Sequence, residues 1–169
     1  MKQLLVLRHA KSSWKHRQLA DHDRPLNKRG KRDAPRMGRL LREQGLVPDW
    51  AFSSTAKRAA KTLDLALEAS GASCEAQRVQ ELYLASPQGI VDVLRRTPEP
   101  CARVIVVGHN PGMEDLVQGL TGEDVVMPTA ALALIDCECD TWNELTLGGV
   151  ERLVRFWRPK ELADGPGHD

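Results

Sequence analysis

The sequence predicts an α/β fold, a three-layer sandwich in which helices cover both faces of a mostly parallel central sheet. Strand-like and helix-like segments alternate along the first two thirds of the 169 residues. The two most apolar runs, residues 3–7 and 102–107, are continuous, which is typical of strands buried on both faces. Each of these runs is followed by a helical pattern, as parallel strands require a crossover connection.

Seven segments predict strands. Four lie in the first two thirds of the chain and are bounded by turn residues, at residues 3–7, 50–53, 75–79 and 102–107. Three more follow in the last third, at residues 130–136, 143–147 and 152–157.

Helices are predicted between the first strands, over residues 27–44, 55–71, 87–96 and 110–120. Asn27, Ser86 and Asn110 have side chains that suit the N-cap position, and a proline follows Ser86 and Asn110 at the first helical position. Pro35 predicts a kink or break in the first helix, because proline has no backbone N–H to donate. A glycine is predicted to end each of the first two helices.

Length and composition predict one globular domain over residues 1–162, since 41% of the residues are hydrophobic. Residues 163–169 are polar and contain Gly and Pro, so we expect a flexible C-terminal tail. No apolar run is long enough for a secretory signal or a membrane span. The four cysteines do not have the spacing of zinc ligands, and we expect reduced thiols in a cytoplasmic protein without a metal site.

The charges are unevenly distributed, although the net charge is only +1. Half of the 24 Lys and Arg residues lie in residues 8–42, together with Asp21, Asp23 and Asp33. This segment is either a solvated helix face or a source of positive potential beside an anionic substrate. Nucleic acid is not an expected partner, because no aromatic residues are interleaved with the basic ones.

Polar residues follow four of the predicted strands. These residues are Arg8 and His9, Ser53 and Ser54, Glu81, and Gly108 and His109. The carboxyl ends of parallel strands meet at one edge of a sheet, where ligands bind in folds of this class. We therefore expect these polar residues to lie around one site.

The residue types at this edge favour an anionic substrate. Two histidines without a third ligand make a poor zinc site, and Arg8 would repel a metal cation. Arg58 lies in the first turn of a predicted helix, where its guanidinium and free backbone N–H groups can face a phosphate. A neutral imidazole is a nucleophile at pH 7, and a transferring phosphoryl group needs fixed positive charge around it. These residues predict covalent catalysis through a phosphohistidine without Mg²⁺, and Glu81 is the candidate general acid.

Four segments resemble known motifs. They are LLVLRHAKSSW (4–14), DHDRPLNKRG (21–30), SSTAKRAAKT (53–62) and VIVVGHNPG (104–112). In this order they resemble the histidine phosphatase superfamily, and within it the short SixA-type phosphohistidine phosphatases. The resemblance implies a phosphoglycerate mutase-like fold, and the short distance between the third and fourth motifs implies that the large helical lid is absent.

The resemblance also implies roles for individual residues. His9 matches the nucleophile, Arg8 and Arg58 match the two phosphate-binding arginines, and His109 matches the second histidine that contacts the phosphoryl group. Glu81 lies near the position of the acid in larger members, but the match there is loose. Three neighbours of the motif residues are expected to contribute to substrate binding: Lys11, Ser12 and Asn110.

The expected function is a cofactor-free phosphatase that hydrolyses phosphohistidine in a protein, for instance in a histidine phosphotransfer domain of a signal-transduction relay. Two alternatives remain open from the sequence. One is a phosphatase for small phosphomonoesters, and the other is a phosphohistidine-binding module without turnover. No membrane or nucleic-acid partner is expected.

Overall fold

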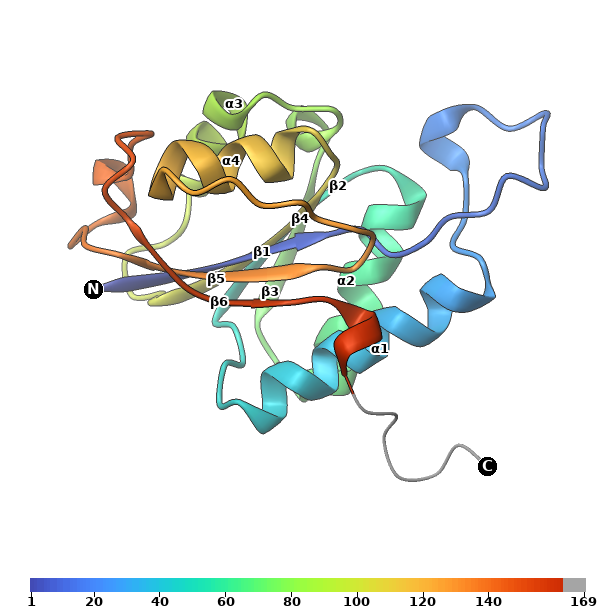
Figure 1. Ribbon diagram of the computed structural model, residues 1–169, viewed down its shortest axis with the longest axis horizontal. Coiled ribbons are helices and arrows are strands. Elements are labelled where there is room, and N and C mark those ends of the chain that lie inside the picture. The colour runs from blue at the N-terminus through green and yellow to red at the C-terminus, as the bar shows by residue number, and fades with distance from the viewer. Residues whose placement is uncertain (163–169) are drawn as a thin grey trace.

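A computed structural model describes residues 1–162, and its centre is a six-stranded sheet (Figure 1). The sheet has the strand order β3-β2-β4-β1-β5-β6. Its strands are β1 (Lys2–Arg8), β2 (Trp50–Ser54), β3 (Glu75–Val79), β4 (Arg103–Gly108), β5 (Leu132–Cys137) and β6 (Arg152–Trp157). The predicted tail, residues 163–169, lies outside the described residues.

The four strands β3, β2, β4 and β1 are parallel, which confirms the predicted mostly parallel sheet. Strand β5 pairs antiparallel with β1, and β6 pairs antiparallel with β5. The central strands β1 and β4 are flanked on both sides, and Leu4 pairs with Val104 in their ladder. Burial on both faces explains why their sequences are continuous apolar runs.

Two helices cover each face of the sheet (Figure 1). Helices α1 (Lys28–Glu43) and α2 (Lys57–Ser70) pack on one face around Met37 and Leu63. Helices α3 (Pro87–Leu94) and α4 (Gly112–Thr121) pack on the other face around Ile90 and Leu116. The three-layer sandwich is therefore confirmed, and no large helical lid interrupts residues 1–162.

Two predicted N-caps are confirmed. The Asn27 side chain accepts a hydrogen bond from the Gly30 N–H at 2.9 Å, and the Ser86 side chain accepts one from the Gly89 N–H at 3.1 Å. Pro35 lies inside α1, and the helix continues through it to Glu43.

The third predicted N-cap, Asn110, is wrong. Helix α4 begins at Gly112 with Pro111 as its N-cap residue, and the peptide bond between Asn110 and Pro111 is cis. The Asn110 side chain instead donates to the carbonyl oxygen of Met127 at 2.9 Å. Its amide therefore ties the end of β4 to the segment before β5.

The strand predicted at residues 143–147 is also wrong. A short 3-10 helix, Trp142–Glu144, occupies part of this segment. The Trp142 side chain is fully buried, and its indole N–H donates to the carbonyl oxygen of Cys101 at 2.8 Å. Burying this large ring turns the backbone away from the sheet edge, although the local composition suits a strand.

Close contacts between backbones fix the loop that follows β1. The Asn27 N–H donates to the carbonyl oxygen of Lys11 at 3.0 Å. A Cβ atom at Gly30 would lie 2.1 Å from that same oxygen, so only glycine lets the first turn of α1 approach so closely. The Thr62 hydroxyl accepts from the Ala10 N–H at 2.9 Å and thereby joins the loop to α2.

None of the helices formed by residues 1–162 combines the length and the apolar character that crossing a membrane requires.

Candidate active site

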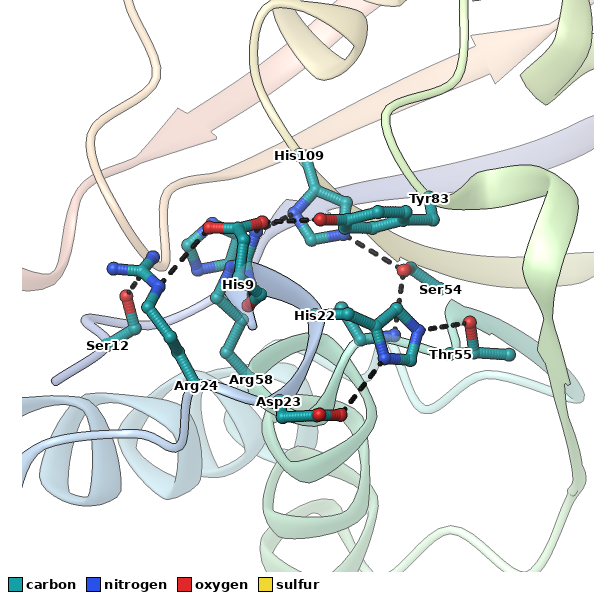
Figure 2. Close-up of polar contacts among 12 residues, drawn as sticks. His9, Ser12, His22, Asp23, Arg24, Ser54, Thr55, Arg58, Tyr83 and His109 are labelled. Carbon is teal, nitrogen blue, oxygen red and sulfur yellow. Dashed lines mark hydrogen bonds and ion pairs between the residues drawn. The ribbon is translucent and has the colours of Figure 1, made fainter. Parts of the chain in front are cut away.

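The carboxyl ends of three parallel strands carry polar side chains to one edge of the sheet, as the sequence predicts. Arg8 and His9 stand at the end of β1, Ser54 at the end of β2, and His109 directly after β4. Figure 2 shows that His9 and His109 lie close to each other and to Arg58 of α2. The centroids of the two imidazole rings are 5.1 Å apart.

The side chains of Arg8, His9, Arg58 and His109 line a pocket of about 300 Å³. Of the residues predicted to act in catalysis or substrate binding, all but Glu81 contribute to it. The lining residues are Arg8, His9, Lys11, Ser12, Trp14, Asp21, Arg24, Arg58, Leu84, His109, Asn110 and Thr129. The predicted juxtaposition of two imidazoles and two guanidinium groups is present in the structure.

His9 is held in a single useful tautomer. Its side chain is buried, and Nδ1 lies 2.8 Å from the carbonyl oxygen of Ala10. A carbonyl oxygen only accepts hydrogen bonds, so Nδ1 carries the proton and Nε2 keeps its lone pair in the neutral ring. Burial lowers the pKa of His9 to about 3, and the nearby His109 and Arg58 act in the same direction. His9 is therefore neutral at pH 7 with an unprotonated Nε2.

His109 has two hydrogen-bond partners. Its Nδ1 lies 3.3 Å from Nη2 of Arg58, a donor, and its Nε2 lies 2.9 Å from the hydroxyl oxygen of Ser54. Nδ1 consequently accepts, and Nε2 donates to Ser54. Burial lowers the pKa of His109 to about 4, with the positive charge of Arg58 as the second cause. His109 is thus neutral at pH 7 and serves as a fixed polar group beside Arg58.

Arg8 and Arg58 supply positive charge from two elements. Arg8 donates from Nη1 to the carbonyl oxygen of Met127 at 3.0 Å, and burial lowers the pKa of its guanidinium. Arg58 donates from Nη1 to the backbone oxygen of Asp21 at 2.7 Å. The Nε of each arginine is buried without a hydrogen-bond partner among residues 1–162. Such unpaired donors are suited to an anionic ligand.

The carboxylate of Asp21 lines the same pocket and lies next to positively charged side chains. Its Oδ2 accepts from Nη2 of Arg58 at 3.0 Å and from the Tyr83 hydroxyl at 2.5 Å. Its Oδ1 lies 3.3 Å from Nε of Arg24. The hydrogen bond from Tyr83 lowers the pKa of Asp21, and the same bond raises the pKa of Tyr83. Asp21 is therefore an anion at pH 7 and a hydrogen-bond acceptor rather than an acid.

The short 3-10 turn Asp21–Asp23 is held in place by aromatic contacts (Figure 2). Nε2 of His22 lies 2.8 Å from the hydroxyl oxygen of Thr55, and the His22 ring packs edge-on against Tyr83 with centroids 5.0 Å apart. Asp21 and Tyr83 are not among the site residues predicted from the sequence. The available signal was the position of Asp21, an acid inside a strongly basic segment that precedes the first helix.

Arg24 joins Ser12 and Trp14 at the rim of the pocket. Its Nη2 donates to the Ser12 hydroxyl at 2.9 Å, and its guanidinium carbon lies 3.4 Å from the centroid of the Trp14 ring. The Ser12 hydroxyl is therefore already engaged by Arg24. The Trp14 ring, 71% exposed, forms an aromatic wall at the pocket mouth.

The structure does not bring Glu81 to the pocket that the other predicted site residues line. Glu81 lies in the 3-10 turn Gln80–Leu82 that follows β3, is exposed, and forms an ion pair with Arg96. This pair lowers the pKa of the Glu81 carboxyl. The turn directs Glu81 away from the site and brings Tyr83 to it, with the Tyr83 and His109 rings 5.4 Å apart.

The described part of the chain contains no cluster of three or more His, Cys, Asp or Glu residues that could hold a metal ion.

Comparison with protein families supports this geometry. The model of the histidine phosphatase superfamily, branch 1, matches residues 4–92. The chain belongs to this superfamily. Its fold is similar to those of solved proteins named SixA.

Two solved structures have similar folds over nearly the whole chain. The SixA protein of Agrobacterium tumefaciens is 28% identical, has a TM-score of 0.80, and the match covers 94% of this chain and 98% of that one. The protein histidine phosphatase SixA in complex with tungstate is 24% identical, with a TM-score of 0.81 and coverage of 95% and 99%. The second likeness is evidence for the fold alone.

Relatives in sequence include uncharacterized proteins and mutases. An uncharacterized protein of Mycobacterium tuberculosis is 32% identical over 165 residues, which cover 91% of this histidine phosphatase and 100% of the relative. An uncharacterized chloroplastic protein of Arabidopsis thaliana is 32% identical over 159 residues, with coverage of 85% and 70%. A 2,3-bisphosphoglycerate-dependent phosphoglycerate mutase of Streptomyces avermitilis is 42% identical over 69 residues, 40% of this chain and 27% of the mutase.

Proposed function

We propose that this histidine phosphatase hydrolyses phosphohistidine in a protein through a covalent phosphohistidine at His9, without a metal ion. The observation that carries the proposal is the pocket in which neutral His9 and His109 lie beside the guanidinium groups of Arg8 and Arg58. Membership of the superfamily supports the reaction class. The likeness to the SixA protein of Agrobacterium tumefaciens, which is 28% identical over nearly the whole chain, supports the choice of substrate.

The first half-reaction forms a bond between Nε2 of His9 and phosphorus. The P–N bond of the substrate breaks, and its electron pair stays on the leaving imidazole nitrogen, which ends protonated by solvent. Arg8 and Arg58 stabilise the charge on the non-bridging oxygens as the phosphoryl group moves, and His109 accepts a hydrogen bond that holds Arg58 in place. Fixed cations do here what Mg²⁺ does in kinases, so no metal is needed for charge neutralisation.

The second half-reaction returns the enzyme to its starting state. A water oxygen attacks phosphorus, the bond to His9 Nε2 breaks, and inorganic phosphate leaves. His9 regains its lone pair on Nε2 because the Ala10 carbonyl retains the proton at Nδ1. A phosphoramidate leaving group needs less acid assistance than an alkoxide, which is consistent with a site whose anticipated acid, Glu81, lies elsewhere.

An open pocket mouth supports a protein substrate. Trp14 and Leu84 line the pocket and are 71% and 62% exposed. A histidine on the surface of a folded protein, such as a histidine phosphotransfer domain in a signalling relay, can reach a site with exposed rims. The four cysteines among residues 1–162 are free, which agrees with a role in the reducing cytoplasm.

One experiment separates this proposal from its alternatives. The wild type and His9→Ala are incubated with a phosphohistidine-containing phosphotransfer domain and with a chromogenic phosphate ester. We expect selective dephosphorylation of the protein by the wild type and none by His9→Ala. Efficient ester turnover with little action on the protein supports a small-molecule phosphatase, and binding without turnover supports a binding module; either result overturns the proposal.

A further inference from the structure

A second hollow, of about 480 Å³, lies beside the active-site pocket. It is formed between the N-terminal half of α1, the segment before β5, and the 3-10 turn Pro159–Glu161, which Figure 1 shows against α1. Five of its ten lining residues are cationic: Arg29, Arg32, Arg36, Arg158 and Lys160. We call this hollow the basic groove.

Only one acidic side chain is among these lining residues. Asp33 is buried, and Arg29, Arg32 and Arg36 surround its carboxylate at 3.6 to 3.8 Å. One carboxylate cannot neutralise both Arg29 and Arg32, so positive charge remains around these two side chains. Arg29 and Arg32 have side chains that are 55% and 56% exposed, so their charges are available to a partner.

Helix stability does not explain why the cations are at this end of α1. The N-terminus of a helix carries partial positive charge and favours Asp or Glu in the first turn. Helix α1 has no acidic residue in its first turn and instead begins with Lys28, Arg29 and Lys31. Cations placed against the helix dipole lower helix stability. A solvated surface helix would gain from the opposite arrangement, which favours a binding role for these charges.

An exposed apolar side chain lies among the cations. Val126 is 74% exposed and lines the basic groove together with Pro128. Arginine side chains around an apolar centre are typical of protein–protein interfaces. An exposed valine contributes nothing to the binding of a polyanion by charge alone. The composition of the groove therefore favours a folded acidic protein over a nucleic acid.

The segment 126–129, which precedes β5, separates the basic groove from the active-site pocket. Thr129 lines both hollows. Two residues earlier, the carbonyl oxygen of Met127 accepts from Arg8 at 3.0 Å and from Asn110 at 2.9 Å, and the Met127 N–H donates to Glu114 at 2.7 Å. A partner bound in the basic groove therefore lies directly beside the active-site pocket, with only this segment between them.

We propose that the basic groove is the docking surface for the phosphorylated protein, and that it binds an acidic, partly apolar surface next to the phosphohistidine. The proposal rests on the proposed function, since it concerns how that substrate is recognised. Attraction between the groove and an acidic surface raises the association rate, and a small ester that touches only the pocket gains nothing from it.

The test uses the triple variant Arg29→Gln/Arg32→Gln/Lys160→Gln in the full chain. The matched control is Arg42→Gln/Lys61→Gln/Arg155→Gln, which removes the same charge from exposed positions outside both hollows. We expect the groove variant to lose about tenfold or more of kcat/KM toward the phosphohistidine protein at low salt, with ester hydrolysis unchanged. We expect the control to stay within about twofold of the wild type on both substrates.

Three outcomes overturn the docking proposal. They are equal losses in the groove and control variants, a loss of ester hydrolysis that parallels the loss with protein, and inhibition by a short single-stranded DNA that is stronger than inhibition by an acidic unphosphorylated phosphotransfer domain. If the wild type itself does not act on phosphohistidine protein, the proposed function fails instead. A Val126→Asp variant adds a second measurement. If the docked protein covers Val126, this variant should dephosphorylate the phosphohistidine protein more slowly and hydrolyse the ester at the wild-type rate.

Discussion

The Nδ1 atom of His9 lies 2.8 Å from the carbonyl oxygen of Ala10, the next residue in the chain. This contact fixes the proton on the side of the ring that faces the backbone and leaves Nε2 free. Burial lowers the pKa of His9 to about 3 and that of His109 to about 4. Both rings are therefore neutral across the whole physiological pH range, as the proposed attack by His9 requires.

The titration of the two imidazoles is the first prediction. In the phosphate-free protein, NMR of the His9 and His109 rings should show both neutral from pH 8 down to about pH 5, with His9 as the Nδ1–H tautomer. A midpoint near 6.5 for His9 would contradict the proposed environment of the nucleophile. The signals are assigned with His9→Gln and His109→Gln.

The first prediction has a second part, because the same low pKa values make the stability of the protein depend on pH. In the unfolded chain both histidines titrate near 6.5, so between pH 6.5 and about 4 the unfolded chain binds more protons than the folded protein. The contribution of these two rings to the free energy of unfolding should thus be fully present above pH 6.5. It should fall as the pH is lowered through this window, by up to about 1.4 kcal/mol per pH unit for each ring. Urea unfolding of His9→Gln should show a shallower fall than the wild type, and an identical slope would be evidence against a depressed pKa.

Arg58 is the residue for the second prediction. Arg58→Ala removes a guanidinium that contacts His109 and has a buried Nε–H without a partner among the described residues, so kcat should fall about 10²-fold or more. Arg58→Lys should recover only part of the rate, because an ammonium cannot reproduce the planar fork. The neighbouring exposed residue gives a control, Lys57→Ala, with a rate near that of the wild type. A rate for Arg58→Ala within threefold of the wild type would exclude a role in the transition state.

Asp21 leads to a third prediction, about anion affinity. Its carboxylate accepts a hydrogen bond from Nη2 of Arg58, and its negative charge repels a phosphate in the same pocket. Asp21→Asn keeps the size of the side chain and removes the charge, so inorganic phosphate should inhibit this variant at concentrations several-fold below those needed for the wild type. Tyr83→Phe is the companion variant, since it removes the hydroxyl donor to Asp21 and leaves the charge. Weaker phosphate inhibition of Asp21→Asn would indicate that Asp21 mainly positions Arg58.

Glu81 is the subject of the fourth prediction. Its exposed side chain pairs with Arg96 and does not line the pocket, so Glu81→Gln should leave kcat on an ester and on phosphohistidine protein within about twofold of the wild type. Exposed ion pairs contribute about 0 to 1 kcal/mol, and the thermal midpoint should change little. A large loss of kcat on the ester alone would indicate that Glu81 is the general acid for the leaving group.

The sequence was sufficient to predict the parts of the site that stand at strand ends. Arg8, His9 and His109 follow buried parallel strands, and parallel strands bring their carboxyl ends together regardless of loop structure. Arg58 was predictable because its helix begins within a few residues of β2. In each case a regular element places the side chain.

The residues that sequence reasoning missed depend on the path of loops. Asp21 reaches Arg58 only because the loop after β1 folds back against α1 and forms a bridge between Ser12 and Leu26. Glu81 and Tyr83 are two residues apart, and the 3-10 turn between them decides which one faces the site. Local composition does not encode such turns, because tertiary contacts stabilise them.

Gly30 provides the last prediction, on the link between α1 and the site. A methyl group at this position would lie 2.1 Å from the carbonyl oxygen of Lys11, so Gly30→Ala should lower the free energy of unfolding by about 1 to 3 kcal/mol despite the higher helix propensity of alanine. Gly89 is a matched control: it also donates its N–H to an N-cap side chain three residues earlier, but a Cβ there would meet its nearest atom at 3.4 Å. Gly89→Ala should be neutral or slightly stabilising in the same urea titration. Because the displaced Lys11 borders the pocket, Gly30→Ala should also weaken phosphate inhibition, and equal stability of the two variants would show that α1 can move away from the loop without cost.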